Sequence, residues 1–155
     1  MLGQSIADPL GAEGRQQTVT GLGFLDIETV LTDTKRLAET SGVELATGMP
    51  VRGYEMHLGE TSGPGREHPM LRLAGGPDGC VSGDGLVAGC YLHGLFASDA
   101  FRRAFLAALG AEPGEIIYGH QIETTLDALA DHLEDSLDLS ALLAAARPPR
   151  VRRAA

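Results

Sequence analysis

The alternation of apolar and polar residues predicts a strand over Val51–Leu58. A period of two places four side chains on one face of this strand: Val51, Gly53, Glu55 and His57. The opposite face then carries Arg52, Tyr54, Met56 and Leu58. Two ionisable side chains, those of Glu55 and His57, therefore share one face of the strand.

Other apolar runs predict shorter strands. Leu22–Ile27 lies between glycines and polar residues and fits a short strand. Met70–Leu73 and Gly79–Ser82 flank a Gly-Gly-Pro-Asp-Gly cluster, which predicts a hairpin of edge strands. Leu86–Leu92 is an apolar run and predicts a buried strand that ends at His93.

Three regions lack a clear apolar period. Residues 1–20 contain several glycines and a proline with few apolar positions, and we expect them to form a connection. Residues 34–47 fit neither the helical nor the strand period, so the sequence leaves their structure open. Residues 146–155 form a basic tail rich in proline and arginine that has nothing to bury, and we expect it to be disordered.

The second half of the chain predicts two amphipathic helices. The first starts after Ser98-Asp99, a pair of good N-cap residues, and ends at Gly110. Its apolar face carries Phe101, Phe105 and Leu109. The second spans Gln121–Ala145, and its apolar stripe carries Ile122, Leu126, Leu129, Leu133 and Leu137. Both faces need a core, so we expect both helices to pack on the same sheet.

Strands interleaved with helices predict an open α/β sheet instead of a sandwich or a bundle. A chain of 155 residues can bury one sizeable core, so residues 1–145 are assigned to one domain or to part of one. The net charge of −9 repels phosphate backbones and argues against nucleic acid as a partner.

The two cysteines, Cys80 and Cys90, have no second pair or closely spaced histidine with which to bind zinc, and we expect free thiols and no metal. No apolar run approaches the roughly 20 residues that span a bilayer, and no signal peptide is apparent. We therefore expect a cytoplasmic protein without a membrane partner.

His93 is the first candidate for chemistry. In open α/β sheets, active sites gather beyond the carboxyl ends of the strands, which is where the predicted strand places this residue. The alternative is a loop histidine that is hydrogen-bonded for structural reasons.

Three motifs carry a resemblance to a known family. Gly89-Cys90-Tyr91-Leu92-His93-Gly94-Leu95-Phe96 resembles the histidine motif of the amidotransferases of the cobyric acid synthase and cobyrinate diamide synthase family. Two further segments agree in the same order: Gly21-Leu22-Gly23-Phe24-Leu25-Asp26 and Gly53-Tyr54-Glu55-Met56-His57. The resemblance covers about residues 1 to 140, and the first of these two segments looks more like the cobyric acid synthase branch.

The resemblance implies a flavodoxin-like open sheet of the class I glutamine amidotransferases, missing its first strands. The family's nucleophile lies in a motif similar to Cys-Gly-Gly-Tyr-Gln-Met-Leu-Gly, and Met1-Leu2-Gly3 resembles its end. The nucleophile would then lie upstream of Met1, and His93 would be the catalytic acid and base. Many class I amidotransferases carry an acidic residue two positions after the histidine, where this chain has Leu95. We expect no appreciable glutaminase activity from the chain alone.

The motif Gly53, Tyr54, Glu55 and His57 has two interpretations. These residues line the glutamine pocket or contact a synthetase domain, or else they form a satisfied polar pair at a sheet edge. The sequence leaves both open.

The resemblance also implies partners. Glutamine would be the substrate of this domain, and ammonia would pass to an N-terminal ATP-dependent synthetase domain that amidates cobyrinic acid a,c-diamide, a corrinoid. ATP and Mg would bind there, so we expect no cofactor in this chain. The alternatives are a related amidotransferase, such as the diamide synthase or a cell-wall amidotransferase subunit, or a non-catalytic binding module.

Overall fold

A computed structural model describes residues 1–146. The chain divides into two compact units, residues 1–116 and the residues from 117 onward, and each is described by itself. Within residues 1–146, seven strands form one open mixed sheet in the first unit, so the predicted α/β class is confirmed. Arg147–Ala155, and with them the predicted tail, lie outside the described residues.

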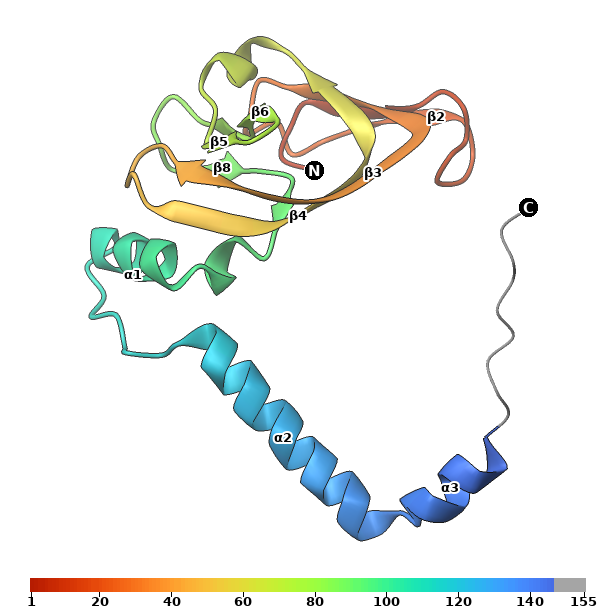
Figure 1. Cartoon of the computed structure of the whole chain (residues 1–155). Helices are drawn as coiled ribbons and strands as arrows, with labels where there is room; N and C mark the ends of the chain where they lie inside the picture. The colour runs from red at the N-terminus through yellow and green to blue at the C-terminus, as the bar shows by residue number, and fades with distance from the viewer. Residues whose placement is uncertain (147–155) are drawn as a thin grey trace. The chain divides into compact units, whose positions relative to one another are not determined.

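Two long antiparallel strands, β3 (Glu28–Glu44) and β4 (Pro50–Ser62), form the centre of the sheet (Figure 1). The predicted strand Val51–Leu58 is therefore confirmed, and the undecided residues 34–47 belong mostly to its partner. The chain reverses because the Glu44 carboxylate accepts hydrogen bonds from the backbone N–H groups of Ala46 (3.1 Å) and Thr47 (2.7 Å).

The start of the chain forms two more strands of this sheet. β1 (Ser5–Asp8) pairs antiparallel with β2 (Gln17–Thr20) and parallel with β3. The Asp8 carboxylate accepts the N–H groups of Glu13 and Ala12 between them, and the hydrogen bond from Glu13 is the main cause that lowers the pKa of Asp8. The prediction of a mere connection over residues 1–20 is wrong.

The predicted strand over Leu22–Ile27 is also wrong. These residues form a bent loop, whose backbone N–H groups bond mostly to carbonyls of the first three residues. Only Leu25 of this segment is buried, at 2% exposure, while Leu22 and Phe24 are exposed. An apolar run is thus spread over a loop that anchors the start of β1.

The strand at Leu71–Leu73 forms a hairpin, but with residues 76–78 instead of the predicted Gly79–Ser82. β5 (Leu71–Leu73) pairs with β6 (Gly76–Asp78) and with β3, whereas β7 (Cys80–Val81) pairs with β8 (Ala88–Gly89) in a separate two-stranded sheet. A one-turn 3₁₀ helix, η1 (Pro64–Glu67), precedes β5.

The predicted single strand Leu86–Leu92 is wrong in extent. Leu86 is 84% exposed, and the run contains two short strands, β8 and β9 (Leu92–His93). The run breaks at Tyr91, whose N–H donates to the Asp78 side chain (3.1 Å) instead of to a neighbouring strand. His93 nevertheless ends a strand, as predicted.

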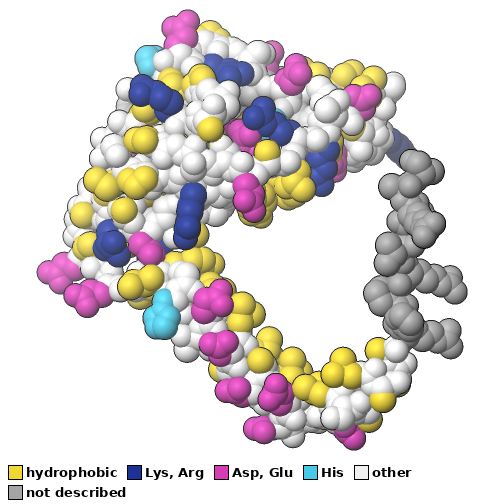
Figure 2. All heavy atoms as spheres, in the orientation of Figure 1, with side chains coloured by type: hydrophobic (Ala, Val, Ile, Leu, Met, Phe, Trp, Pro, Cys, Tyr) yellow, Lys and Arg dark blue, Asp and Glu magenta, His cyan; other side chains and the backbone are white. Residues whose placement is uncertain are grey.

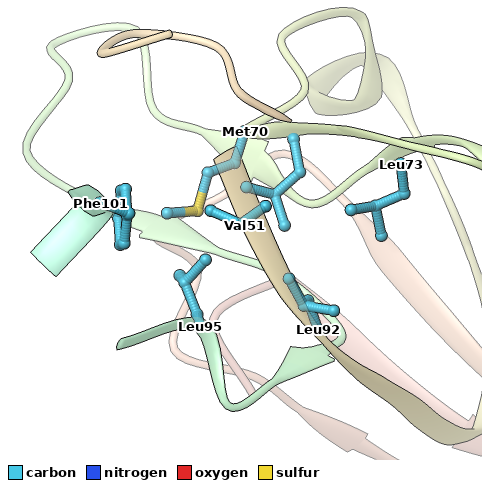
Figure 3. Packing of buried hydrophobic residues seen from close by; sticks show 7 residues of the cluster. Val51, Met70, Leu73, Leu92, Leu95 and Phe101 are labelled. Carbon is cyan, nitrogen blue, oxygen red and sulfur yellow. The ribbon is translucent and has the colours of Figure 1, made fainter. Parts of the chain in front are cut away.

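The core lies between the sheet and α1 (Asp99–Ala108), which follows the 3₁₀ helix η2 (Leu95–Ala97). Figure 3 shows side chains from β4, β5, β9 and α1 pointing toward one another. The first predicted helix is confirmed: Phe101 is buried at 1% exposure, and Gly110 ends the helix with φ 79°. The Ser98 hydroxyl at the N-cap position accepts the Arg52 N–H (3.0 Å), which ties α1 to β4.

The second unit contains α2 (Tyr118–Ser136) and α3 (Leu139–Ala145) instead of the single predicted helix. The helix breaks because Asp138 caps α3, its carboxylate accepting the Ala141 N–H (2.9 Å). Figure 2 shows hydrophobic side chains along one side of both helices and acidic ones along the other side of α2. This stripe is exposed, and its packing on a sheet stays a prediction. None of the helices within residues 1–146 has the length and apolar character needed to cross a membrane.

Candidate active site

His93 is held at the edge of the main sheet by strand pairing. β9 runs antiparallel to β4, with Tyr54 opposite His93 and Glu55 opposite Leu92. Gly53 permits this close approach, because a Cβ atom at residue 53 would collide with the His93 carbonyl oxygen. The motif Gly53-Tyr54 therefore has a structural reason: it lets β9 dock on β4 at the histidine.

Two contacts orient the His93 ring. Its Nδ1 lies 3.0 Å from the Tyr91 carbonyl oxygen, and its ring stacks on Tyr54 with centroids 5.0 Å apart and planes at 16°. A carbonyl oxygen can only accept, so this hydrogen bond forms when Nδ1 carries the ring proton. No residue in the described part of the chain hydrogen bonds to Nε2, which leaves that nitrogen able to take a proton.

His93 lines an open groove with a volume of about 1000 Å³. Tyr54, Gly53 and Gly94 lie beside it, and residues 37–41 of β3, Arg52 and Ala97 complete the lining. The groove has the size of sites that hold small molecules. The structure thus brings together three of the predicted site residues: His93, Gly53 and Tyr54.

Glu55 and His57 lie on the other face of the sheet, since β4 alternates and Tyr54 faces the histidine. Glu55 is 8% exposed and pairs with Arg36 (Nε to Oε2, 2.7 Å). His57 bonds through Nδ1 to the Gly59 carbonyl (2.9 Å) and stacks on Tyr91 with centroids 4.4 Å apart. The predicted shared face is confirmed, and both residues have structural partners away from the groove.

A second cavity of about 670 Å³ lies on this other face. It is lined by Glu55, His57 and Tyr91, and also by both cysteines. His93 is not among its lining residues. The chemistry that the sequence predicts for His93 therefore belongs to the groove and not to this cavity.

The two cysteines are unsuited to be nucleophiles. Both are free thiols, as predicted, and Cys80 is 2% exposed and donates to the Gly65 carbonyl (3.0 Å). Burial raises the pKa of Cys80, and it raises the pKa of Cys90 to about 11. Neither thiol lines the groove that holds His93.

Sequence reasoning missed two residues that act on His93 through its hydrogen bond. Tyr91 supplies the carbonyl acceptor, and Asp78 binds the Tyr91 N–H. Tyr91 stands inside the histidine motif, which was a usable signal, whereas Asp78 stands in a turn cluster and gave none. Among the described residues, no three His, Cys, Asp or Glu side chains gather in a way that could hold a metal ion.

Residues 1–101 match the family of CobB/CobQ-like glutamine amidotransferase domains. The chain belongs to this family. Its open mixed sheet agrees with the flavodoxin-like fold expected for class I glutamine amidotransferases.

Curated relatives extend the match beyond residue 101. A cobyric acid synthase of Methylorubrum populi is 56% identical over 149 residues, which is 96% of this chain and 30% of that protein. A cobyric acid synthase of Cereibacter sphaeroides is 50% identical over 147 residues, 95% of this chain and 31% of that protein. One of Bradyrhizobium diazoefficiens is 49% identical over 147 residues, with 95% and 30% covered. The chain spans about 30% of the length of these relatives.

Proposed function

We propose that this chain is the histidine-bearing part of the glutaminase site of a cobyric acid synthase, and that His93 is its catalytic acid and base. The observation that carries the proposal is the orientation of His93 in a chain of this family. The Nδ1 atom of His93 is hydrogen-bonded to the Tyr91 carbonyl, and Nε2 has no partner among residues 1–146. The residue also lines the groove. A general base needs such a free nitrogen within reach of its proton donor.

The chemistry needs a thiol and an imidazole. A cysteine thiol gives its proton to Nε2 of His93, and the thiolate attacks the carboxamide carbon of glutamine. The C–N bond then breaks, ammonia leaves with the proton that the imidazolium returns, and water hydrolyses the glutamyl thioester. Neither Cys80 nor Cys90 lines the groove. The resemblance of Met1-Leu2-Gly3 to the end of the family's cysteine motif implies that the thiol lies upstream of residue 1.

The remaining partners follow from the relatives' name and the family resemblance. Ammonia would pass to an N-terminal ATP-dependent synthetase domain, which binds ATP and Mg and amidates side chains of cobyrinic acid a,c-diamide. The share of about 30% of each relative leaves room for such a domain outside this chain. The relatives' shared name favours this reading over the diamide synthase.

Ammonia release from glutamine tests the proposal. The 155-residue chain and a version extended upstream through the family's cysteine motif are compared, each with and without His93→Ala. We expect activity only in the extended form and a loss of at least about a hundredfold with His93→Ala, the usual scale of acid–base catalysis. His132→Ala, at an exposed position of α2, is the matched control and keeps full activity.

Two results would overturn the proposal. Activity of the 155-residue chain would mean that a thiol within it is the nucleophile. An extended protein that binds glutamine without releasing ammonia would instead be a non-catalytic binding module.

A further inference from the structure

The residue that would orient His93 in many class I amidotransferases is absent here. The position two residues after the histidine is Leu95, which is buried in the core at 8% exposure. A backbone carbonyl, that of Tyr91, accepts the Nδ1 proton instead. The precision of His93 then depends on how firmly Tyr91 is held.

Tyr91 is fixed by contacts at three of its groups. Its N–H donates to Oδ2 of Asp78 (3.1 Å), and its ring stacks on His57. Its hydroxyl lies 2.6 Å from Oγ1 of Thr61, which in turn lies 2.9 Å from Oγ1 of Thr29. These partners come from β6, β4 and β3, so the acceptor of His93 is tied to the centre of the sheet.

Burial favours this arrangement. Asp78 is 9% exposed and Thr29 is 3% exposed, so both are shielded from water that would compete for their hydrogen bonds. The ring of Tyr91 lines the second cavity, while its carbonyl serves the histidine that lines the groove. One residue thus connects the two faces.

We propose that Tyr91 is a positioning residue, held by Asp78 and His57, that keeps neutral His93 in the tautomer with its proton on Nδ1. Its catalytic consequence rests on the proposed role of His93 as the base. The tautomer with the proton on Nε2 could not take a proton from a thiol at that nitrogen. The network on the His57 face therefore sets the fraction of His93 that is ready to act.

Nitrogen NMR of the histidine rings tests the tautomer without any need for activity. The full 155-residue chain is labelled with ¹⁵N-histidine, and His93→Gln identifies the His93 signals among those of the five histidines. We expect neutral His93 to be mainly protonated on Nδ1. A mainly Nε2-protonated ring in the unsubstituted chain would overturn the proposal before any variant is made.

Substitutions at Asp78 test the network. Asp78→Ala removes the acceptor of the Tyr91 N–H, and we expect the ratio of the two tautomers to move toward the Nε2–H form by roughly three- to tenfold, the scale of one hydrogen bond. Asp78→Asn keeps an acceptor oxygen and should restore the ratio. Asp84→Ala is the control, because Asp84 bonds to Ser82 and Leu86 and not to Tyr91.

Tyr91→Phe is a milder variant for the case in which Asp78→Ala fails to fold. It keeps the ring and the carbonyl but loses the hydrogen bond to Thr61, so a smaller shift in the same direction is expected. An unchanged tautomer ratio in a folded Asp78→Ala or Tyr91→Phe chain would overturn the proposal.

Kinetics of the extended form separate the two ideas. If the network positions the base, Asp78→Ala lowers kcat by the factor by which the fraction of Nδ1-protonated His93 falls and leaves KM nearly unchanged, and Asp78→Asn restores kcat. If Asp78→Ala shifts the tautomer ratio but the extended form has no glutaminase activity even without a substitution, the network is supported and the proposed function is rejected. If the extended form is active and Asp78→Ala lowers its activity without shifting the tautomer ratio, the proposed function is supported and the network is rejected.

Discussion

A half-buried thiol near a carboxylate resists ionisation, and Cys90 is in that position. Burial raises its pKa to about 11, and the negative charge of Asp78 acts in the same direction. The Cys90 thiol also donates a hydrogen bond to the Leu92 carbonyl (3.7 Å), the backbone group next to His93. A cysteine three positions before His93 in the same motif can therefore be unreactive, because its surroundings decide its nucleophilicity.

The raised pKa of Cys90 predicts how stability depends on pH. The folded chain binds the thiol proton more tightly than the unfolded chain does, so the contribution is complete below the ordinary value of 9.0 and is lost as the pH rises toward about 11. Urea unfolding across this range measures it. We expect the free energy of unfolding to fall less steeply with pH in Cys90→Ala than in the parent chain.

Leu109→Ala is the control for this measurement, because Leu109 is exposed and nothing at that position titrates. Its unfolding free energy should follow the parent's slope against pH. Equal slopes for Cys90→Ala and the parent would show that the thiol of Cys90 titrates alike in the folded and unfolded chains.

At the scale of elements, the pairing of β4 with β9 depends on a missing side chain. A Cβ atom at residue 53 would meet the His93 carbonyl oxygen and the Leu92 side chain, and both belong to β9. We expect Gly53→Ala to destabilise the fold by about 1–3 kcal/mol, the usual cost of overpacking. In the extended form it should also reduce glutaminase activity, because it displaces the backbone of His93.

Gly83→Ala is the matched control, since a Cβ atom there meets no atom within 4 Å. Urea unfolding of both variants gives the two free energies, and only the Gly53 variant should lose stability. A Gly53→Ala chain as stable as the Gly83→Ala chain would mean that β9 does not need this close approach.

The elements that sequence predicts correctly are those with one buried face. β4 and α1 have that property, and their apolar periods are legible at Val51 and Phe101. The middle of β3 is exposed on both faces, so residues 34–41 show no period to find. The break between α2 and α3 was missed because the cap at Asp138 interrupts a stripe that continues on both sides.

The candidate site also has a part that the sequence predicts and a part that it does not. His93 and Tyr54 stand in motifs and can be found from the chain alone, and alternation along β4 correctly separates Tyr54 from Glu55 and His57. The stacking of Tyr54 on His93 and the bond from Tyr91 to Asp78 depend on strand register between distant segments. The pattern along one strand shows which face each residue occupies but not which residue of a distant segment lies opposite it.

At the scale of the whole molecule, the connection between the two units is irregular and exposed to solvent. Residues 111–117 form no regular structure and are exposed, and Leu109 and Ile116 add exposed apolar side chains at its ends. Arg102 of α1 holds the connection by donating to the Ile116 carbonyl (2.8 Å). Beyond that point, the apolar stripe of α2 and α3 is exposed, and an amphipathic helix of this kind usually packs its apolar face on another surface.

This connection predicts the first site of limited proteolysis. A glutamate-specific protease should cut after Glu115, because that bond lies in exposed irregular chain, whereas Glu44 and Glu55 are buried in strands. Mass spectrometry of early digests should show fragments 1–115 and 116–155 before any others. Glu115→Gln removes the cleavage site and should slow the first cut several-fold, with other sites unaffected.

The outcome also decides how the helical stripe is used. Rapid cleavage after Glu115 in the isolated chain would mean that the two units move independently. The apolar stripe of α2 and α3 would then be free to bind a surface outside this chain. Protection of Glu115, with the first cuts elsewhere, would instead support the packing of Ile122, Leu126 and their neighbours on the sheet that the sequence predicts. In that case Leu126→Asp should expose Glu115 to the protease, because a charge in the stripe would release the helix from the sheet.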